Sequence, residues 1–137
     1  MADRHRTAAA SRDGHLALRR AERQQQLVEI LVGSTGFTAA ELADRLRVSI
    51  RTVERDIERL RDAGVPFTSR PGRGGGISLD APATIATVDL DPAEIAAIIS
   101  SLAIVGPNSS PSAASATVKL VAALRMGSEE AGLTTSE

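Results

Sequence analysis

Two short amphipathic segments joined by a tight turn constrain the fold of this chain most strongly. The first begins at Thr38 and ends near Arg47, Val48 and Ser49 form the turn, and the second reads IRTVERDIERLRDAG. Thr38 and Glu41 have the three-residue spacing of a capping box, and Ser49 can cap the helix that follows. Each segment has one apolar face, made by Ala39, Leu42, Ala43 and Leu46 in the first and by Ile50, Val53, Ile57 and Leu60 in the second. The pattern predicts two adjacent helices with a tight turn between them.

A glycine-rich segment follows these helices. Gly64 stands where a helix C-cap glycine belongs, and two strand-like runs, VPFTSR and GISLD, flank the turn. The run from Gly72 to Gly76 could be read as a phosphate-binding loop, but such a loop needs a following helix and a Gly-Lys-Ser/Thr ending. Here Ile77 continues a strand-like run, and Pro82 follows in an extended segment. We therefore expect the tip of a β-hairpin, whose glycines supply positive φ and allow close approach of the backbone.

Upstream of these elements, residues 16–32 have helical periodicity, with one apolar face formed by Leu27, Ile30 and Leu31. The glycines at 33 and 36 end this helix. Residues 1–15 are polar and mixed in charge, so we expect them to form a flexible tail. The predicted order over residues 16–80 is thus helix, helix, tight turn, helix and hairpin.

The second half of the chain predicts a helical hairpin after a linker at residues 81–90. Asp91, Pro92 and Glu94 have the cap, first-turn and capping-acid positions of a helix that ends near Val105. A second helix is predicted over about residues 112–125, and residues 126–137 are expected to be a flexible tail. Both helices have few charges and carry apolar residues on more than one side. Such helices are ordinarily covered on more than one side.

The charge is divided unequally along the chain. Residues 1–79 hold 14 Arg and 10 Asp or Glu, whereas residues 80–137 hold two cations and seven acids. This asymmetry indicates that only the first half meets a polyanion. Trp and Tyr are absent, which removes the usual stacking platform for single-stranded nucleic acid.

Composition also limits the cellular location and the kinds of chemical site that we expect for this chain. The chain has no cysteine, no secretory signal and no apolar run of the ~20 residues that a membrane span needs. We therefore expect a soluble, cytoplasmic protein. Its two histidines, His5 and His15, lie in or beside the N-terminal tail without partners at ligand spacing. No metal site, cofactor or catalytic centre is predicted.

The third predicted helix has a basic face opposite its apolar face. At 100° per residue, Arg51, Arg55 and Arg59 stack along the side away from the apolar stripe. A charged helix face ordinarily contacts only solvent and binds no partner. This helix, however, follows a tight turn, and a hairpin with Arg70 and Arg73 comes after it. The arrangement is that of a helix-turn-helix with a wing, which places the start of its third helix against base edges in the major groove of DNA. The predicted fold class is mainly α, an α+β winged helix.

The stretch TAAELADRLRVSIRTVERDIERLRDAGVP, followed by GRGGGISL, resembles the N-terminal winged helix-turn-helix of DeoR-type and, more closely, WYL-domain transcriptional regulators. The resemblance covers roughly residues 17–80, and the helices over residues 91–124 resemble the linker segment of the same proteins. It implies a three-helix winged helix-turn-helix, sequence-specific binding of double-stranded DNA and regulation of transcription. In those regulators a C-terminal WYL domain senses a ligand or a nucleic acid. We expect that domain to be absent here, because the chain ends where it would begin.

Position assigns roles to the residues of the third helix. Arg51 and Arg55 are candidates for contacts to guanine O6 and N7, and Arg59 is a candidate for a phosphate contact. Ser49 and Thr52 lie at the helix start, where hydroxyl groups and the helix N-terminus meet phosphate.

Other polar residues have predicted roles around this helix. Thr38 is a helix cap that can also contact a phosphate, and Arg70 and Arg73 of the hairpin are expected to contact the sugar-phosphate backbone or the minor groove. Asp56 lies at the edge of the apolar stripe and is interpreted as a structural partner for an arginine. Solvated positions are predicted for Arg45 and Arg47, with phosphate contacts as the alternative.

The apolar helices of the second half predict a homodimer held by residues 91–125, with contacts made by Ile95, Ile98, Ile99, Leu102, Val118 and Val121. A dimer presents two recognition helices to successive major grooves about 34 Å apart, which predicts a palindromic or nearly palindromic site. Two alternatives remain. The chain could be an interaction protein that pairs with a full-length relative, or the detached switch of a protein like the biotin operon repressor, whose ligase would not fit in 137 residues.

Overall fold

The computed structural model describes residues 2–80 and 87–133, with side chains described for residues 11–80 and 87–127. It divides into two compact units, Met1–Ala86 and Thr87–Glu137. The predicted linker at residues 81–90 spans the boundary, and its residues 81–86 lie outside the described part of the chain. Among the described residues, no helix is long and apolar enough to cross a membrane.

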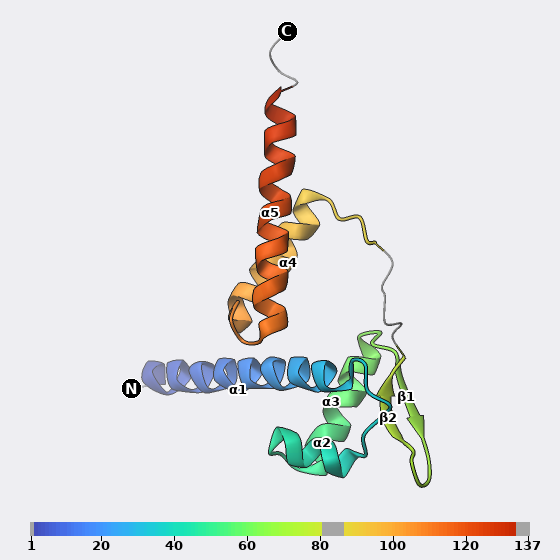
Figure 1. Ribbon diagram of the computed structural model, residues 1–137. Helices are drawn as coiled ribbons and strands as arrows, with labels where there is room; N and C mark the ends of the chain where they lie inside the picture. Colours follow the sequence, from blue (N-terminus) through green and yellow to red (C-terminus); the bar gives the residue numbers. More distant parts are fainter. Residues whose placement is uncertain (1, 81–86, 134–137) are drawn as a thin grey trace. The chain divides into compact units, whose positions relative to one another are not determined.

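The first unit is a winged helix-turn-helix (Figure 1). Its elements follow the chain as α1 (Ala2–Leu31), α2 (Ala39–Leu46), α3 (Ile50–Asp62), β1 (Phe67–Arg70) and β2 (Gly76–Leu79). The two strands form an antiparallel pair in which Phe67 lies opposite Leu79 and Arg70 lies opposite Gly76. This order of helices and strands confirms the predicted fold class.

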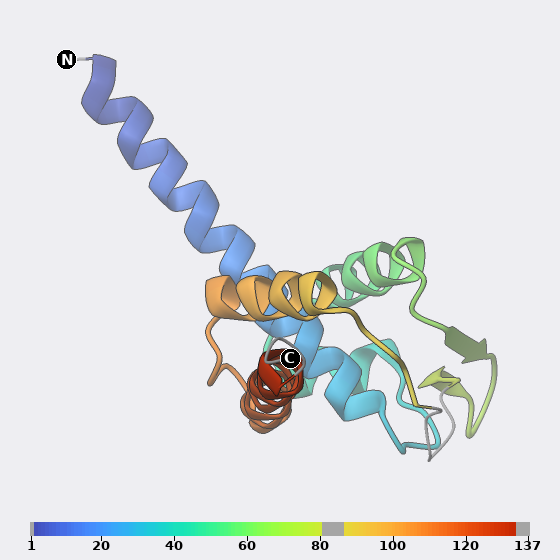
Figure 2. The same cartoon turned by 90° about the horizontal axis from the view of Figure 1, so that it is seen from above.

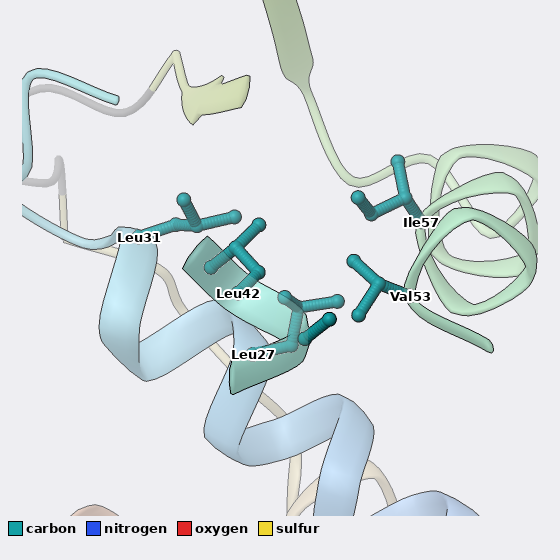
Figure 3. Close-up of a cluster of buried hydrophobic side chains, with 6 residues drawn as sticks. Leu27, Leu31, Leu42, Val53 and Ile57 are labelled. Carbon is teal, nitrogen blue, oxygen red and sulfur yellow. The ribbon is translucent and has the colours of Figure 1, made fainter. Parts of the chain in front are cut away.

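A small apolar core joins the three helices of this unit (Figure 3). Leu27 and Leu31 of α1, Leu42 of α2, and Val53 and Ile57 of α3 point toward one another, and all are at most 4% exposed. Partly buried side chains from the hairpin, Phe67, Ile77 and Leu79, pack against this cluster. The predicted apolar faces therefore meet in one core.

Ile50 departs from its predicted place on the buried stripe of α3. It is 46% exposed, whereas Ile57 on the same helix is 4% exposed. Ile50 is the first residue of α3, so it lies at the end of the helix, beyond the reach of the core that α1 and α2 form with its middle.

Local hydrogen bonds fix the helix ends at the predicted signals. Thr38 caps α2 in a capping box: its N–H donates to Glu41 Oε2 at 2.7 Å, and the Glu41 N–H donates to Thr38 Oγ1 at 3.2 Å. The Ser49 hydroxyl caps α3 by accepting from the Thr52 N–H at 3.1 Å. At the other end of α3, Ala63 is the C-cap and Gly64 follows with φ 95°. These boundaries confirm the helix limits predicted around the tight turn.

The hairpin is joined to the helices by a backbone bridge that the sequence did not indicate. Phe37 and Ile77 exchange two N–H···O bonds of 2.9 and 2.7 Å. A Cβ at Gly76 would lie 2.8 Å from the Phe37 backbone, and one at Gly75 would lie 2.2 Å from the Arg70 carbonyl oxygen. These two glycines therefore allow the backbone to approach the protein's own chain closely.

Helix α1 is much longer than predicted. It begins at Ala2 and runs unbroken to Leu31 (Figure 2), so the prediction of a flexible tail is wrong over residues 2–15, and residue 1 lies outside the described part of the chain. Its first half is rich in alanine, which has the highest helix propensity, and Gly14 costs only about 1 kcal/mol. The polar composition there reflects exposure: described side chains from residue 11 to 20 are all exposed except the partly buried Leu18.

The second unit is a helical hairpin of α4 (Pro92–Val105) and α5 (Pro111–Leu133). Asp91 and Glu94 form the predicted capping box, with bonds of 2.8 Å in both directions and Pro92 in the first turn. Helix α5 continues beyond the expected end near residue 125 and includes Gly127, so the prediction of a tail from residue 126 is wrong as far as Leu133. The good helix formers Glu129 and Glu130 support this extension.

Apolar side chains of this hairpin differ in burial. Ile95 and Ala113 are buried, and Ile99, Leu102, Leu120, Val121 and Leu124 are partly buried. Ile98, Ile104 and Val118 are 38%, 73% and 70% exposed. A substantial apolar surface is therefore left uncovered on the second unit.

Candidate nucleic-acid interface

The turn between α2 and α3 sets the direction of α3. Arg47 ends α2 in the left-handed conformation, with φ 55° and ψ 45°. Its N–H donates to the Asp44 carbonyl at 3.3 Å, and the Val48 N–H donates to the Ala43 carbonyl at 3.0 Å. This Schellman arrangement reverses the chain in few residues, so α3 can start at once. It is the tight turn that the sequence predicted.

The start of α3 is ordered by its own hydroxyl groups. The Ser49 hydroxyl accepts from the Thr52 N–H, and the Ser49 and Thr52 hydroxyls lie 2.9 Å apart in a second hydrogen bond. Ser49 is exposed and Thr52 is partly buried. The N-terminal end of α3, with the partial positive charge of a helix start, is thus held rigid at the surface.

The solvent face of α3 carries the three predicted arginines. Arg51 and Arg55 are exposed, one turn apart, and neither forms an ion pair within the described residues. Arg59, one turn further, has a half-exposed side chain whose Nη1 lies 3.7 Å from Asp56 Oδ1. Arg51 and Arg55 are therefore the freer cations, and Arg59 is shared with a carboxylate.

The hairpin adds two more exposed arginines to the same unit. Arg70 ends β1, opposite Gly76, and Arg73 lies in the turn that joins the strands. In that turn Gly72 and Gly74 have φ of 93° and 73° with open space around them. Positive φ at the tip, as predicted, lets the turn protrude with Arg73 exposed to solvent.

The start of α2 is occupied by its capping network. The Thr38 hydroxyl donates to Glu41 Oε2 at 2.9 Å. Hydrogen bonds from the Thr38 backbone and hydroxyl, with the nearby charge of Arg45, hold the pKa of the Glu41 carboxyl below its ordinary value. The Arg45 guanidinium lies 4.3 Å from the centre of the Phe37 ring, a cation–π contact that the sequence did not indicate.

Asp56 is the buried ionic centre of the unit. Its side chain is 1% exposed and receives a two-pronged contact from Arg23 of α1, through Nε to Oδ2 and through Nη2 to Oδ1 at 3.1 Å. The Gln24 amide donates to Oδ1 at 3.1 Å as well. The interpretation of Asp56 as a structural partner for an arginine is confirmed, with α1 supplying the principal partner.

A groove of about 410 Å³ lies between α1 and α3, and we call it the α1–α3 groove. It is lined from α1 by Leu16, Arg19, Arg20 and Arg23 and from α3 by Thr52, Arg55, Asp56 and Arg59. The α1 arginines were missed because only the apolar face of that helix was considered. Their signal was present in the sequence as Leu16, Arg19, Arg20 and Arg23, spaced as one face of a helix.

Eight predicted DNA-contacting residues thus belong to one unit. Five lie at the start and along one side of α3, two lie on the hairpin, and one caps α2: Ser49, Arg51, Thr52, Arg55 and Arg59, then Arg70 and Arg73, then Thr38. The six residues predicted for dimer contacts lie on α4 and α5 in the other unit. Of these, Ile95 has almost no exposed surface.

Comparison with known proteins agrees with the winged helix-turn-helix fold described above. Residues 23–77, which run from the Arg23 partner of Asp56 to β2, match the HTH domain family. This part of the chain is therefore similar to that family, in agreement with the winged helix-turn-helix fold of the unit.

One relative is an "Uncharacterized HTH-type transcriptional regulator YobV" of Bacillus subtilis (strain 168), 43% identical over 58 residues. The matched stretch covers 42% of this chain and 18% of that regulator, so the chain corresponds to about a fifth of its length. No solved structure matches the chain. The predicted relationship to WYL-domain regulators stays a prediction.

Proposed function

We propose that this chain is a sequence-specific, double-stranded DNA-binding regulator of transcription that acts through its winged helix-turn-helix. One observation carries the proposal: an HTH domain presents the rigid start and the arginine face of α3 to solvent, beside a basic hairpin. A helix of this kind fits the major groove, and arginine matches both guanine and phosphate. The name of the relative from B. subtilis supports a role in transcription.

Residues of α3 divide between reading bases and holding the backbone. Arg51 and Arg55, free of ion pairs in the described residues, make the guanine contacts. The Ser49 hydroxyl and the N–H groups at the start of α3 meet a phosphate, with Thr52 ordering that end. Arg59 contacts a phosphate further along, at the expense of its ion pair with Asp56.

The hairpin and the start of α2 hold the duplex without reading it. Arg70 and Arg73 contact the sugar-phosphate backbone or the minor groove beside the site of α3. Thr38 contributes a backbone contact only as far as its capping bonds to Glu41 allow. The positions of these residues on separate elements suit a surface that follows a curved duplex.

The second unit makes the regulator a homodimer. Ile98, Ile104 and Val118 leave apolar surface that the hairpin of α4 and α5 does not cover. A second copy of the same hairpin covers it with one self-complementary surface. Of the residues predicted for this contact, Ile98 and Val118 have the most exposed surface, while Ile95 is buried in the structure.

Selection of bound fragments from a random pool of duplex DNA tests specificity and half-site arrangement together. The proposal expects a recovered motif with two inverted half-sites. Binding should also depend steeply on salt: about four arginines per subunit, eight in a dimer, give a slope of log K against log salt of about −7. A slope near zero contradicts DNA binding altogether.

Single variants separate base reading from backbone contact. Arg51→Ala or Arg55→Ala should relax preference at one position of each half-site, at a cost of about 1–3 kcal/mol per lost bidentate contact. Arg73→Ala should weaken binding to all sequences alike, and Arg125→Ala, which removes an exposed charge from the other unit, should change neither. If Arg73→Ala changes the preferred motif, the hairpin reads the sequence.

The exposed apolar residues of α4 and α5 also suit pairing with a full-length relative. In that second candidate function, the chain would interfere with a larger regulator instead of binding an operator as a homodimer. The selection experiment distinguishes the two, because a chain that acts only by pairing enriches no motif by itself.

A further inference from the structure

Positive charge is concentrated in the α1–α3 groove beyond what its one carboxylate neutralises. Five arginines and one aspartate line the groove. Asp56 is occupied by the two-pronged contact of Arg23 and by Arg59 at 3.7 Å. The remaining three, Arg19, Arg20 and Arg55, make no ion pair with any described residue, and all three are exposed.

Three guanidinium groups that lack an ion pair among the described residues line one groove and repel each other, and an anion placed between them relieves that repulsion. Arginine presents a planar fork of N–H donors that matches the oxygens of a phosphate group. The Thr52 hydroxyl, which also lines the groove, can add a neutral hydrogen bond. The chemistry of the lining therefore suits a phosphate group.

The position of Arg55 indicates where such a phosphate comes from. Arg55 belongs both to the exposed arginine face of α3 and to the lining of the α1–α3 groove. A duplex placed against α3 therefore brings its backbone to the edge of the groove. A free anion in the groove would compete for the same arginine that reads the duplex.

We propose that the α1–α3 groove binds a phosphate of the DNA backbone, so that α1 is a DNA-contacting element alongside α3 and the hairpin. Arg19 and Arg20 hold this phosphate from the α1 side, and the ion pair of Arg23 with Asp56 fixes α1 at the correct distance from α3. This inference rests on the proposed DNA binding and adds to it a contact made by the helix that precedes the helix-turn-helix.

The test is the salt dependence of duplex binding by the double variant Arg19→Ala/Arg20→Ala, measured by fluorescence anisotropy on the selected site. Each phosphate contact adds about 0.9 to the steepness of the slope. The variant should therefore lose about 0.9 units of slope per bound subunit, or about 2 units in a dimer, while keeping the same preferred motif. Arg19→Lys/Arg20→Lys, which retains both charges, should restore most of the slope.

Arg61→Ala is the matched control. Arg61 is an exposed arginine of α3 that does not line the groove, so its loss removes a charge from the same unit without removing the contact. Circular dichroism and thermal unfolding of each variant establish that it is folded. Because Arg19 and Arg20 are exposed, their substitution should leave the melting temperature nearly unchanged.

The outcomes separate this inference from the function on which it rests. If the unmodified protein binds with a steep slope and the double variant keeps that slope, the groove makes no DNA contact and the inference is wrong. If Arg61→Ala lowers the slope as much per charge, only net charge matters, and the inference is equally wrong. If the unmodified protein has no salt dependence, the proposed function itself fails.

A second experiment tests whether a soluble anion, and not DNA, binds in the α1–α3 groove. Titration with pyrophosphate in the absence of DNA should give only weak, millimolar binding to the unmodified protein. Micromolar saturation that is lost in Arg19→Ala/Arg20→Ala, together with an unchanged DNA salt slope, would assign the groove to a soluble phosphate compound and overturn its assignment to DNA.

Discussion

Ile50 and Ile57 are the same residue type on the same helix in opposite environments. Ile57 is 4% exposed and belongs to the core, whereas Ile50 is 46% exposed at the first position of α3. Ile57→Ala removes buried methyl groups and leaves a cavity, so it should lower the free energy of unfolding by about 2–5 kcal/mol. Ile50→Ala should cost less than about 1 kcal/mol. Equilibrium unfolding in urea measures both, and equal losses would show that Ile50 is buried in solution.

Arg47 is the one described non-glycine residue with positive φ, at 55°. A side chain in that conformation costs roughly 1–2 kcal/mol, which glycine avoids. Glycine gives the unfolded chain more conformational entropy than arginine does, and this offsets part of the gain. Arg47→Gly should therefore raise the free energy of unfolding by a net amount of about 1 kcal/mol. Arg47→Ala is the control, because it removes the same charge and keeps the strain. If both variants change stability equally, the effect is due to charge.

At the scale of elements, the hairpin depends on close backbone approach to the strand-like residue before α2. Gly76→Ala places a Cβ 2.8 Å from the Phe37 backbone at a φ of 148°. It should break the bridge between Phe37 and Ile77 and lower both stability and DNA affinity. Gly74→Ala meets open space and pays only for its φ of 73°, about 1 kcal/mol. Thermal unfolding compares the two, and a Gly74→Ala variant as damaged as Gly76→Ala would argue against the bridge.

The capping box of α2 gives stability a pH dependence with a defined sign. Hydrogen bonds from the Thr38 backbone and hydroxyl hold the pKa of Glu41 below its ordinary value. The folded state therefore favours the charged carboxylate, and this stabilisation is present above the unfolded pKa and lost as pH falls through the lowered one. Glu41→Gln can still cap the helix but does not titrate.

The melting temperature of the unmodified protein and of Glu41→Gln should be compared from about pH 7 to about pH 3. The advantage of the unmodified protein should shrink as the pH falls below the ordinary glutamate range. An advantage that is constant over the whole range would show that Glu41 contributes nothing through its charge.

The parts of this fold that the sequence predicted are those determined by short-range contacts. The helix caps at Thr38, Ser49 and Asp91 form hydrogen bonds to residues three positions further along the chain, so the local sequence is enough to predict them. The bridge between Phe37 and Ile77 joins residues far apart in the chain and leaves no local pattern. The start of α1 was misplaced because polar composition indicates exposure, whereas alanine content determines helix formation.

The candidate site follows the same division. The arginines of α3 were found because helical periodicity places them opposite the apolar stripe. The pairing of Asp56 was predicted, but Arg23, the partner, lies 33 residues away and could be identified only from the fold. The α1–α3 groove was missed for the same reason, since it exists only once α1 and α3 are packed together.

At the scale of the whole molecule, charge and apolar surface are separated along the chain. The basic excess lies within residues 1–79, and the acidic excess lies within residues 80–137, where exposed apolar side chains are also found on α4 and α5. A polyanion would be repelled by the second unit and attracted by the first. This separation suits a division of labour in which one unit binds DNA and the other joins two chains.

The dimer can be tested with two residues whose side chains are free to meet a partner. Ile98 on α4 and Val118 on α5 are 38% and 70% exposed, so Ile98→Asp/Val118→Asp should spare the packing of the hairpin itself. Two buried charges in a symmetric apolar interface would each need a partner, and each copy introduces both. The variant should therefore be a monomer that keeps its helical content and its winged helix-turn-helix fold.

Loss of the dimer should also remove most of the DNA affinity, because one recognition helix then replaces two that are spaced for successive major grooves about 34 Å apart. Lys119→Glu is the matched control: it changes the net charge by the same two units at an exposed position of α5 that is already charged. It should remain a dimer and bind DNA nearly as well as the unmodified protein. Sedimentation equilibrium decides the matter, since the chain has a mass of 14.3 kDa and a dimer has twice that mass. An unmodified protein that sediments as a monomer at tens of micromolar would refute the homodimer and leave its apolar helices to a different partner.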